Sequence, residues 1–380
     1  MISPLEIYKR RRTLATHSIH TMPVLVLMPH SRCDCRCLMC DIWKANQNRV
    51  ELSRKEITRQ LPDLRQLGTR WVVLSGGEAL MHSNLWALCE LLEELGARIT
   101  LLSTGLLLAQ QAANVVRWCD EVIVSLDGSR QVHDAIRRVP RAYDRLTAGV
   151  AALRGEDSEY RITGRCVVQR RNYFDIQRII DAAHEIGLDQ ISFLGADVAT
   201  EAFNRPIPWD EKRVTEVALS ATEAEEFAQL IEETLVAYKA EFRSGFVAEG
   251  PAKLRRLGRY FRALHSLDEF PETICNAPWV SAVIEANGDV RPCFFHPPYG
   301  SIREKPLAEI LNAKAAVSFR RRLDVTCNPI CRRCVCALHL SAFRRLRRNR
   351  STMPRVARRH SRYGGAAHAA AGEQGGANER

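Results

Sequence analysis

Residues 33–40 read CDCRCLMC, from Cys33 to Cys40. Cys33, Cys37 and Cys40 have the spacing C-x3-C-x2-C, which suits three thiolates that hold three irons of a [4Fe–4S] cubane. The fourth iron is then left open, and an open iron predicts that a further ligand binds there. Cys35 is a spare thiol in this arrangement, because its ligation would close the open iron. A zinc site with all four sulfurs is the alternative, although zinc sites favour C-x2-C halves separated by a loop.

The chain around this loop alternates short apolar runs with amphipathic helical stretches. The expected strands are residues 23–28, 71–74, 98–102, 121–125, 161–169 and 190–194. The expected helices between and after them are residues 56–67, 84–95, 109–118, 142–154 and 176–186. Strand–helix units in series predict parallel pairing with right-handed crossovers, so the fold class is α/β, a partial (β/α)6 barrel. Polar and glycine-rich residues follow the strands, where such folds build active sites.

A second cysteine-rich region follows the barrel. Residues 223–242 and 254–264 have helical periodicity, and residues 281–285 and 290–292 flank an Asn-Gly turn typical of a β-hairpin. The expected organisation is a basic amino-terminal extension, a barrel, a helical linker, a cysteine-rich domain and a basic disordered tail, at residues 1–21, 22–240, 241–271, 272–340 and 341–380.

Composition narrows the class of protein. The chain is 46% hydrophobic and 26% charged, and it lacks an apolar run near the roughly 20 residues of a membrane span, so we expect a cytoplasmic enzyme. The net charge of +11 owes much to nine arginines between residues 344 and 362, a pattern typical of a solvated tail; nucleic acid is not an expected partner. Ten of the 13 cysteines fall in two dense groups, which indicates metal rather than disulfides. The isolated Cys89, Cys119 and Cys166 are expected in the core.

The first cysteine group and its surroundings resemble the radical S-adenosylmethionine (radical SAM) superfamily. Met39 stands where the family often has an aromatic residue that packs on adenine. Ser75-Gly76-Gly77-Glu78 resembles the family's GGE motif, which follows the second strand and binds the methionine amino group. Glycines let the backbone approach a ligand closely, and a carboxylate suits an ammonium group. The resemblance implies a [4Fe–4S] cluster and S-adenosylmethionine as cofactors.

Three later strand ends extend the resemblance. Ser125 and Asp127, with His133-Asp134 and Arg137 downstream, are candidates for polar contacts to cofactor or substrate; a turn with a helix cap is the alternative. Arg165 stands in a stretch like the family's cofactor-contacting one and could pair with the methionine carboxylate, or form a salt bridge at the barrel mouth. Gln169 and Asn172 share that stretch, and Asp197 is a candidate at the sixth strand.

The second cysteine group resembles the SPASM and twitch auxiliary domains of the same superfamily. Its form is C-x12-G-x4-C followed by C-x2-C, and the resemblance implies a second [4Fe–4S] cluster held by Cys275, Cys293, Cys331 and Cys334. Cys327 and Cys336 are substitute ligands. The C-x2-C-x5-C-x3-C run of a full SPASM domain is absent, which favours one auxiliary cluster; a zinc ribbon is the alternative.

These features predict an enzyme that reductively cleaves S-adenosylmethionine and abstracts hydrogen from a substrate carbon. Its expected partners are a reducing electron donor, such as flavodoxin or ferredoxin, and a substrate. Maturation of a peptide or protein is the favoured hypothesis. Radical oxidation or rearrangement of a small molecule, such as a sugar, lipid or natural-product intermediate, is the second. A non-catalytic iron–sulfur protein is the third.

Overall fold

A nine-stranded sheet organises the computed structural model, which describes residues 3–205 and 207–341. The strand order is β6-β5-β4-β3-β2-β1-β7-β8-β9. The strands are β1 Val24–Leu27, β2 Trp71–Leu74, β3 Arg98–Ser103, β4 Glu121–Ser125, β5 Ile162–Val168, β6 Gln190–Gly195, β7 Ser281–Ile284, β8 Asp289–Arg291 and β9 Gly300–Ser301. β1 to β6 pair in parallel in sequence order, which confirms the predicted barrel strands.

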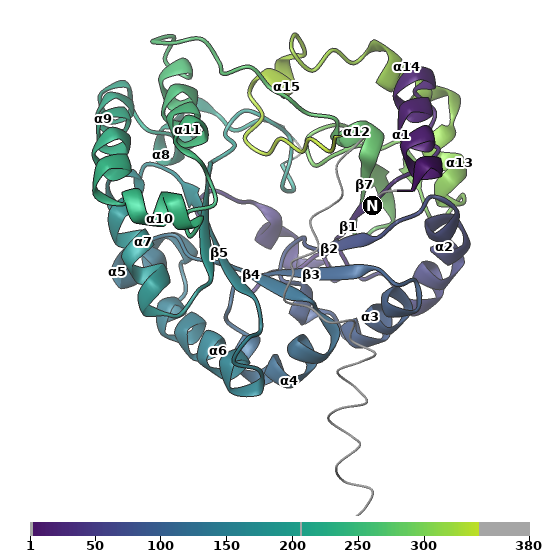
Figure 1. Cartoon of the computed structure of the whole chain (residues 1–380), viewed down its shortest axis with the longest axis horizontal. Helices are drawn as coiled ribbons and strands as arrows, with labels where there is room; N and C mark the ends of the chain where they lie inside the picture. The colour runs from purple at the N-terminus through teal and green to yellow at the C-terminus, as the bar shows by residue number, and fades with distance from the viewer. Residues whose placement is uncertain (1–2, 206, 342–380) are drawn as a thin grey trace, which may run out of the picture.

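Helices cover the outer face of the curved sheet (Figure 1). The barrel helices are α2 Arg54–Gln66, α3 Leu85–Glu94, α4 Leu108–Trp118, α5 Arg130–Arg137, α6 Ala142–Glu156, α7 Ile176–Glu185 and α8 Glu211–Val217. Three short 3-10 helices are η1 Ile42–Gln47, η2 Ala79–Met81 and η3 Tyr173–Asp175. The other helices are α1 Pro4–Thr16, α9 Ala221–Ala237, α10 Lys239–Ser244, α11 Pro251–Ala263, α12 Ala277–Val280, α13 Leu307–Asn312, α14 Lys314–Arg322 and α15 Pro329–Arg332.

Several helices differ from the sequence prediction, and two of the differences lie in the barrel and its linker. The helix expected at 223–242 is broken at Tyr238, whose φ of −105° and ψ of 32° separate α9 from α10. α5 was not among the expected helices, and it lies between β4 and α6. Its eight residues are charged or polar except for Val132, Ala135 and Ile136, so the apolar pattern is short.

The cysteine-rich region continues the barrel sheet. β7 pairs in parallel with β1, with Val24 opposite Ser281 and Leu27 opposite Ile284. β7 and β8 form the predicted hairpin, and Gly288 at φ +89° occupies its turn. Figure 1 shows β7 beside β1 at the side of the barrel away from β5. The carboxyl end of β7 therefore joins the edge at which β1 to β6 end.

Strand alternation divides the core into two parts. Every second strand residue, such as Leu25, Val72 and Val124, packs with the helices in one large cluster. A smaller cluster inside the barrel mouth contains Cys35, Cys37, Leu38, Met39 and their neighbours. The isolated Cys89, Cys119 and Cys166 are fully buried in the large cluster, as predicted.

The amino-terminal segment is helical and lies beside α13 and α14 (Figure 1). Arg10 of its basic cluster is buried and pairs with Glu6 at 2.6 Å. The buried Arg320 of α14 donates to the backbone oxygen of His17 at 2.6 Å. The expected basic tail at 341–380 lies outside the described residues beyond Ser341. None of the helices in the described ranges is long and apolar enough to cross a membrane.

Candidate active site

The cysteine loop follows β1 and is held by α5 and α8. The backbone N–H groups of Arg36 and Leu38 donate to the carbonyl oxygens of Arg137 and Ile136, at 3.1 and 3.2 Å. The Arg213 guanidinium donates to the Leu38 carbonyl from α8. The last turn of α5 thus supplies carbonyl groups that a helix end leaves free. These contacts place the loop at the barrel mouth.

Two of the three predicted ligands, Cys37 and Cys40, have a nitrogen donor at their sulfur. The backbone N–H of Ile42 donates to Cys40 Sγ at 3.4 Å, and Arg137 Nη1 donates to Cys37 Sγ at 3.4 Å. Asn46 holds the Cys33 backbone through two hydrogen bonds of 2.9 and 2.8 Å. Hydrogen bonds to sulfur stabilise cluster thiolates and tune their potential. The environment of Cys33, Cys37 and Cys40 therefore fits an iron–sulfur cluster.

Cys35 differs from these three ligands. Its side chain is fully buried between Cys33 and Cys37. A hydrogen bond with Cys33 and burial raise the pKa of Cys35 well above its usual value, so the thiol keeps its proton. Its role as a spare thiol stays a prediction.

The glycine motif packs directly on the cysteine loop. A Cβ on Gly77 would overlap the carbonyl oxygen of Arg32 and lie 3.1 Å from Cys33 Cβ. Gly76 has φ +104°, in the left-handed region that favours glycine. The Glu78 N–H donates to the Arg32 carbonyl oxygen at 2.9 Å. Both glycines allow the segment after β2 to pack closely on the segment after β1. The sequence did not reveal this structural role.

Two carboxylates share one hydroxyl beside this motif. Thr104 Oγ1 lies 2.7 Å from Glu78 Oε2 and 3.1 Å from Asp34 Oδ1. Glu78 is fully buried and also accepts from Ser103 Oγ, the Thr104 N–H and the Leu80 N–H. Burial, and secondarily the charge of Asp34, raise the pKa of Glu78 to about 7. A cation here would stabilise both ionised carboxylates. Glu78 as a ligand of the methionine ammonium stays a prediction.

Asp127 pairs within the protein. Its carboxylate forms a buried ion pair with Arg137 and accepts from the Val167 N–H at 3.0 Å. Its own N–H donates to Nδ1 of the buried His133 at 3.2 Å. Asp127 thus acts on the site through Arg137, which touches Cys37. Ser125 is half-buried at the end of β4, opposite Arg165 in the sheet register.

Arg165 faces the interior of the barrel from β5. Its buried Nε has no hydrogen-bond partner, and no ion pair joins it to a carboxylate among residues 3–205 and 207–341. The salt-bridge alternative is therefore not supported in this part of the chain. Gln169 is also fully buried, and neither of its side-chain polar atoms has a partner there.

Asn172 and Asp197 have structural roles. Asn172 Nδ2 donates to the carbonyl oxygens of Asp127 and Val167 at 2.8 and 3.1 Å. Asp197 pairs with Arg205 at 3.0 Å, and both side chains are 1% exposed. Asp197 thus anchors the segment that follows β6.

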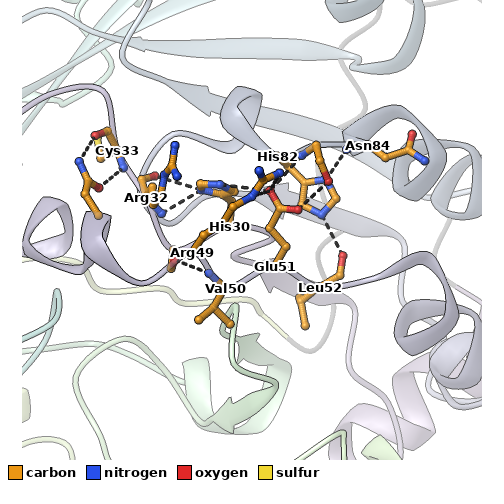
Figure 2. Close-up of polar contacts among 12 residues, drawn as sticks. His30, Arg32, Cys33, Arg49, Val50, Glu51, Leu52, His82 and Asn84 are labelled. Atoms are coloured by element: carbon orange, nitrogen blue, oxygen red, sulfur yellow. Dashed lines mark hydrogen bonds and ion pairs between the residues drawn. The ribbon is translucent and has the colours of Figure 1, made fainter.

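A histidine–carboxylate network supports the start of the cysteine loop (Figure 2). His30 Nδ1 accepts from the Arg32 N–H at 2.8 Å, and His30 Nε2 lies 3.2 Å from Glu51 Oε1. Ser83 also donates to Glu51, through its N–H at 3.0 Å and its hydroxyl at 2.6 Å. His82 Nε2 lies 2.8 Å from the Leu52 carbonyl oxygen. These residues are not predictable from the sequence, because single histidines far apart along the chain form no motif.

A cavity of about 640 Å³ opens between the cysteine loop and the cysteine-rich region. Gly76 and Gly77 form one wall and Phe203 and Phe294 another. The rings of Phe203 and Phe294 stack at a centroid distance of 6.1 Å. Phe294 follows the predicted ligand Cys293, and Ile42 lies two residues after Cys40, so the cavity is lined by residues that flank both cysteine groups.

The second cysteine group gathers five thiols. Burial, with nearby Cys275 and Cys336 as smaller causes, raises the pKa of Cys293 to about 11. Burial likewise raises the pKa of Cys331 to about 12, with Cys293 and Cys275 as further causes. Backbone N–H groups reach two of the sulfurs, that of Ala277 at Cys275 and that of Cys336 at Cys334, at 3.5 and 3.4 Å.

Cys327 and Cys336, the two substitute ligands, differ in their surroundings. Cys327 is exposed, and its sulfur lies 3.6 Å from Thr326 Oγ1. Cys336 is also exposed, but it lies close enough to Cys293 and Cys334 to raise the pKa of both thiols. His296 Nε2 also lies 3.4 Å from Cys331 Sγ, a contact that the sequence did not predict. The set Cys275, Cys293, Cys331 and Cys334 fits a cluster, and its assignment stays a prediction.

The side chains of the two cysteine groups do not surround a single point, as the ligands of one metal ion would. In the described part of the chain, no three His, Cys, Asp or Glu side chains meet around one point as ligands of one metal ion. Thiolates of a cubane each bind a different iron, so they need not meet in this way.

Two family models match the chain at these two sites. The radical SAM superfamily model matches residues 27–183, and the SPASM model, an iron–sulfur cluster-binding domain, matches residues 275–335. The chain belongs to the radical SAM superfamily. Together the matches span more than half of its 380 residues. A [4Fe–4S] cluster, S-adenosylmethionine and an auxiliary iron–sulfur cluster are the cofactors that these two domains imply.

Relatives of this radical SAM chain have different names. It is 28% identical over 161 residues to an AdoMet-dependent heme synthase of Methanosarcina barkeri, across 41% of this chain and 45% of that protein. It is 30% identical over 182 residues to an Fe-coproporphyrin III synthase of the same organism, across 45% and 43%. The matches thus span less than half the length of either relative.

The solved structures show the fold. Streptococcus suis SuiB bound to the precursor peptide SuiA aligns with a TM-score of 0.58 at 16% identity, across 86% of this chain and 74% of SuiB.

Proposed function

We propose that this protein reductively cleaves S-adenosylmethionine and uses the resulting 5′-deoxyadenosyl radical to abstract hydrogen from a substrate carbon. One observation carries the proposal: Gly77 packs against Arg32 and Cys33, so the expected ammonium-binding motif, which lines the cavity, lies directly against the three-cysteine loop. The cluster supplies the electron that breaks the C–S bond when the cofactors are bound.

The side chains near this wall suit the methionine part of the cofactor. Asp34 and Glu78 place negative charge beside the cysteine loop, where an ammonium group would stabilise both. Arg165 has a buried Nε without an acceptor in the described residues, which suits a carboxylate. Thr104 holds both carboxylates before the cofactor arrives, which lowers the entropy cost of orienting them.

We propose a small organic molecule as the substrate. The cavity of about 640 Å³ lies within the range of roughly 300–1,000 Å³ typical of small-molecule sites. The curated relatives are named for heme and Fe-coproporphyrin III, and the stacked Phe203 and Phe294 suit a planar ring. A tetrapyrrole is therefore the first substrate class to test.

Peptide maturation is the second candidate. SuiB has this fold and binds a peptide, and the cavity is open to solvent, which an extended chain would need. At 16% identity this likeness speaks for the fold alone, so it weighs less than the curated relatives.

The test combines cofactor chemistry with substrate binding. Anaerobically reconstituted protein should hold about eight irons per chain and form 5′-deoxyadenosine with dithionite. Titration of Fe-coproporphyrin III should shift its absorption band in the wild type. Phe294→Ala should weaken this binding, and Tyr8→Ala, at an exposed aromatic residue of α1, should leave it unchanged. No deoxyadenosine would overturn the reaction, whereas porphyrin binding that both variants retain would exclude this cavity as its site.

A further inference from the structure

A second cavity reaches the cysteine loop from outside the barrel. It has a volume of about 680 Å³, and Leu38, which follows Cys37, forms part of its lining. Residues of α5, the segment around η3, and Glu216 and Glu223 form its walls. We call it the Leu38 groove.

The Leu38 groove carries unpaired positive charge. Its two acidic residues are neutralised by arginines of the chain: Glu216 pairs with Arg213 at 2.6 Å, and Glu223 pairs with Arg170 at 3.0 Å. Arg138 and Arg171 also line the groove, and no ion pair joins either to a carboxylate among the described residues.

Two neighbours add to this surface. Arg36 is exposed, and its N–H donates to the Arg137 carbonyl oxygen, beside Arg138. Phe174, which is 56% exposed, supplies an apolar contact at the groove. Cations around an exposed aromatic residue form a surface that complements an acidic protein.

The groove and the substrate cavity have separate linings. They share no lining residue. Leu38 of the cysteine loop lines the groove, whereas Gly76, Gly77 and Ile42 line the cavity. A partner in the groove would therefore approach Cys37 without blocking the substrate.

We infer that the Leu38 groove is the docking surface for an acidic, low-potential electron-transfer protein. This inference rests on the proposed function, because reductive cleavage needs an external electron. The reduced carrier loses one electron per turnover. That electron breaks the C5′–S bond of S-adenosylmethionine, which yields methionine and the 5′-deoxyadenosyl radical.

Binding of purified flavodoxin tests the surface directly. The double variant Arg138→Glu/Arg171→Glu should weaken binding at low salt at least tenfold, because like charges would face the carrier. The matched control Lys55→Glu/Arg59→Glu changes the net charge equally on exposed positions of α2, far from α5 and α7 in Figure 1, and should bind like the wild type. Added salt should weaken binding of the wild type and the control more than that of the groove variant.

Cleavage assays separate this inference from the proposed function. With dithionite, all three proteins should form 5′-deoxyadenosine at equal rates, since a small reductant needs no docking surface. With reduced flavodoxin, the groove variant should be at least tenfold slower. If charge reversal lowers iron content, Arg138→Gln/Arg171→Gln should give an intermediate loss. The docking site would be overturned if the groove and control variants bound flavodoxin equally and were reduced by it at equal rates. It would also be overturned if flavodoxin did not bind the wild type. No cleavage with dithionite would instead overturn the proposed function.

Discussion

The Arg137 guanidinium donates to Cys37 Sγ at 3.4 Å while it pairs with the buried carboxylate of Asp127. A positive charge beside a cluster ligand stabilises the reduced form, because reduction adds negative charge. Asp127 partly offsets that charge. The pair therefore acts as a positioning and tuning element for the cysteine loop.

Opposite shifts in redox potential should follow from removing either member of this pair. Arg137→Gln should lower the midpoint potential of the cluster by roughly 60 mV, a tenfold change in a one-electron equilibrium. Asp127→Asn should raise it, because the arginine charge is then uncompensated. Redox titration followed by electron paramagnetic resonance measures both values, and Arg138→Gln is the control. Shifts of the same sign would indicate a purely structural role.

Gly77→Ala should release the cluster of the cysteine loop. The new Cβ would overlap the Arg32 carbonyl oxygen, so the loop would have to move. We expect about four irons per chain to remain, from the auxiliary cluster, with no 5′-deoxyadenosine formed. Gly155→Ala is the matched control, because nothing lies within 4 Å of its Cβ position on α6. Full iron content in Gly77→Ala would contradict the packing argument.

The iron content of cysteine variants should show which cysteines near the carboxyl end of the described chain bind the auxiliary cluster. Cys334→Ala should lose about four irons, because Cys334 lies among the gathered thiols and its sulfur accepts a backbone N–H. Cys327→Ala should keep about eight, since the Cys327 sulfur lies beside Thr326 and Cys327 is not among the thiols that raise the pKa of Cys293, Cys331 and Cys334. Iron analysis and Mössbauer spectra measure the difference. Iron loss in Cys327→Ala would move the ligand assignment to that residue.

Glu78 should make the cluster-free protein less stable as pH rises. Burial raises its pKa from 4.5 to about 7, so the folded chain holds this proton more tightly than the unfolded chain. The contribution of protonated Glu78 to the free energy of unfolding is fully present below about pH 4.5. It is lost as pH rises to about 7. Urea unfolding at several pH values should show that the free energy of unfolding declines as pH rises. In Glu78→Gln this decline should be smaller by a few kcal/mol. Identical pH profiles would show that Glu78 has an ordinary pKa.

Local sequence patterns predicted the barrel well. The expected strands at 71–74 and 121–125 have the observed bounds, because apolar β-branched runs flanked by polar residues define a buried strand locally. The helix break at Tyr238 was missed, since the apolar periodicity continues across it.

Contacts between distant segments limited the prediction of the site. Gly77 was expected to face a ligand, yet its nearest neighbour is the backbone of Arg32, 45 positions earlier. Asp127 was expected at the cofactor and instead pairs with Arg137 on a helix that was not predicted. Local patterns set the positions of these residues along the chain, and tertiary packing selects their partners.

The pairing of β7 with β1 makes the auxiliary region part of the barrel's architecture. A chain cut before Ser281 would leave β1 as a bare edge strand, with unpaired N–H and C=O groups along an apolar segment. Such an edge invites association with other chains, so a truncated core is expected to aggregate. We therefore expect the two iron–sulfur modules to fold together, so that deletion of either one destabilises the other.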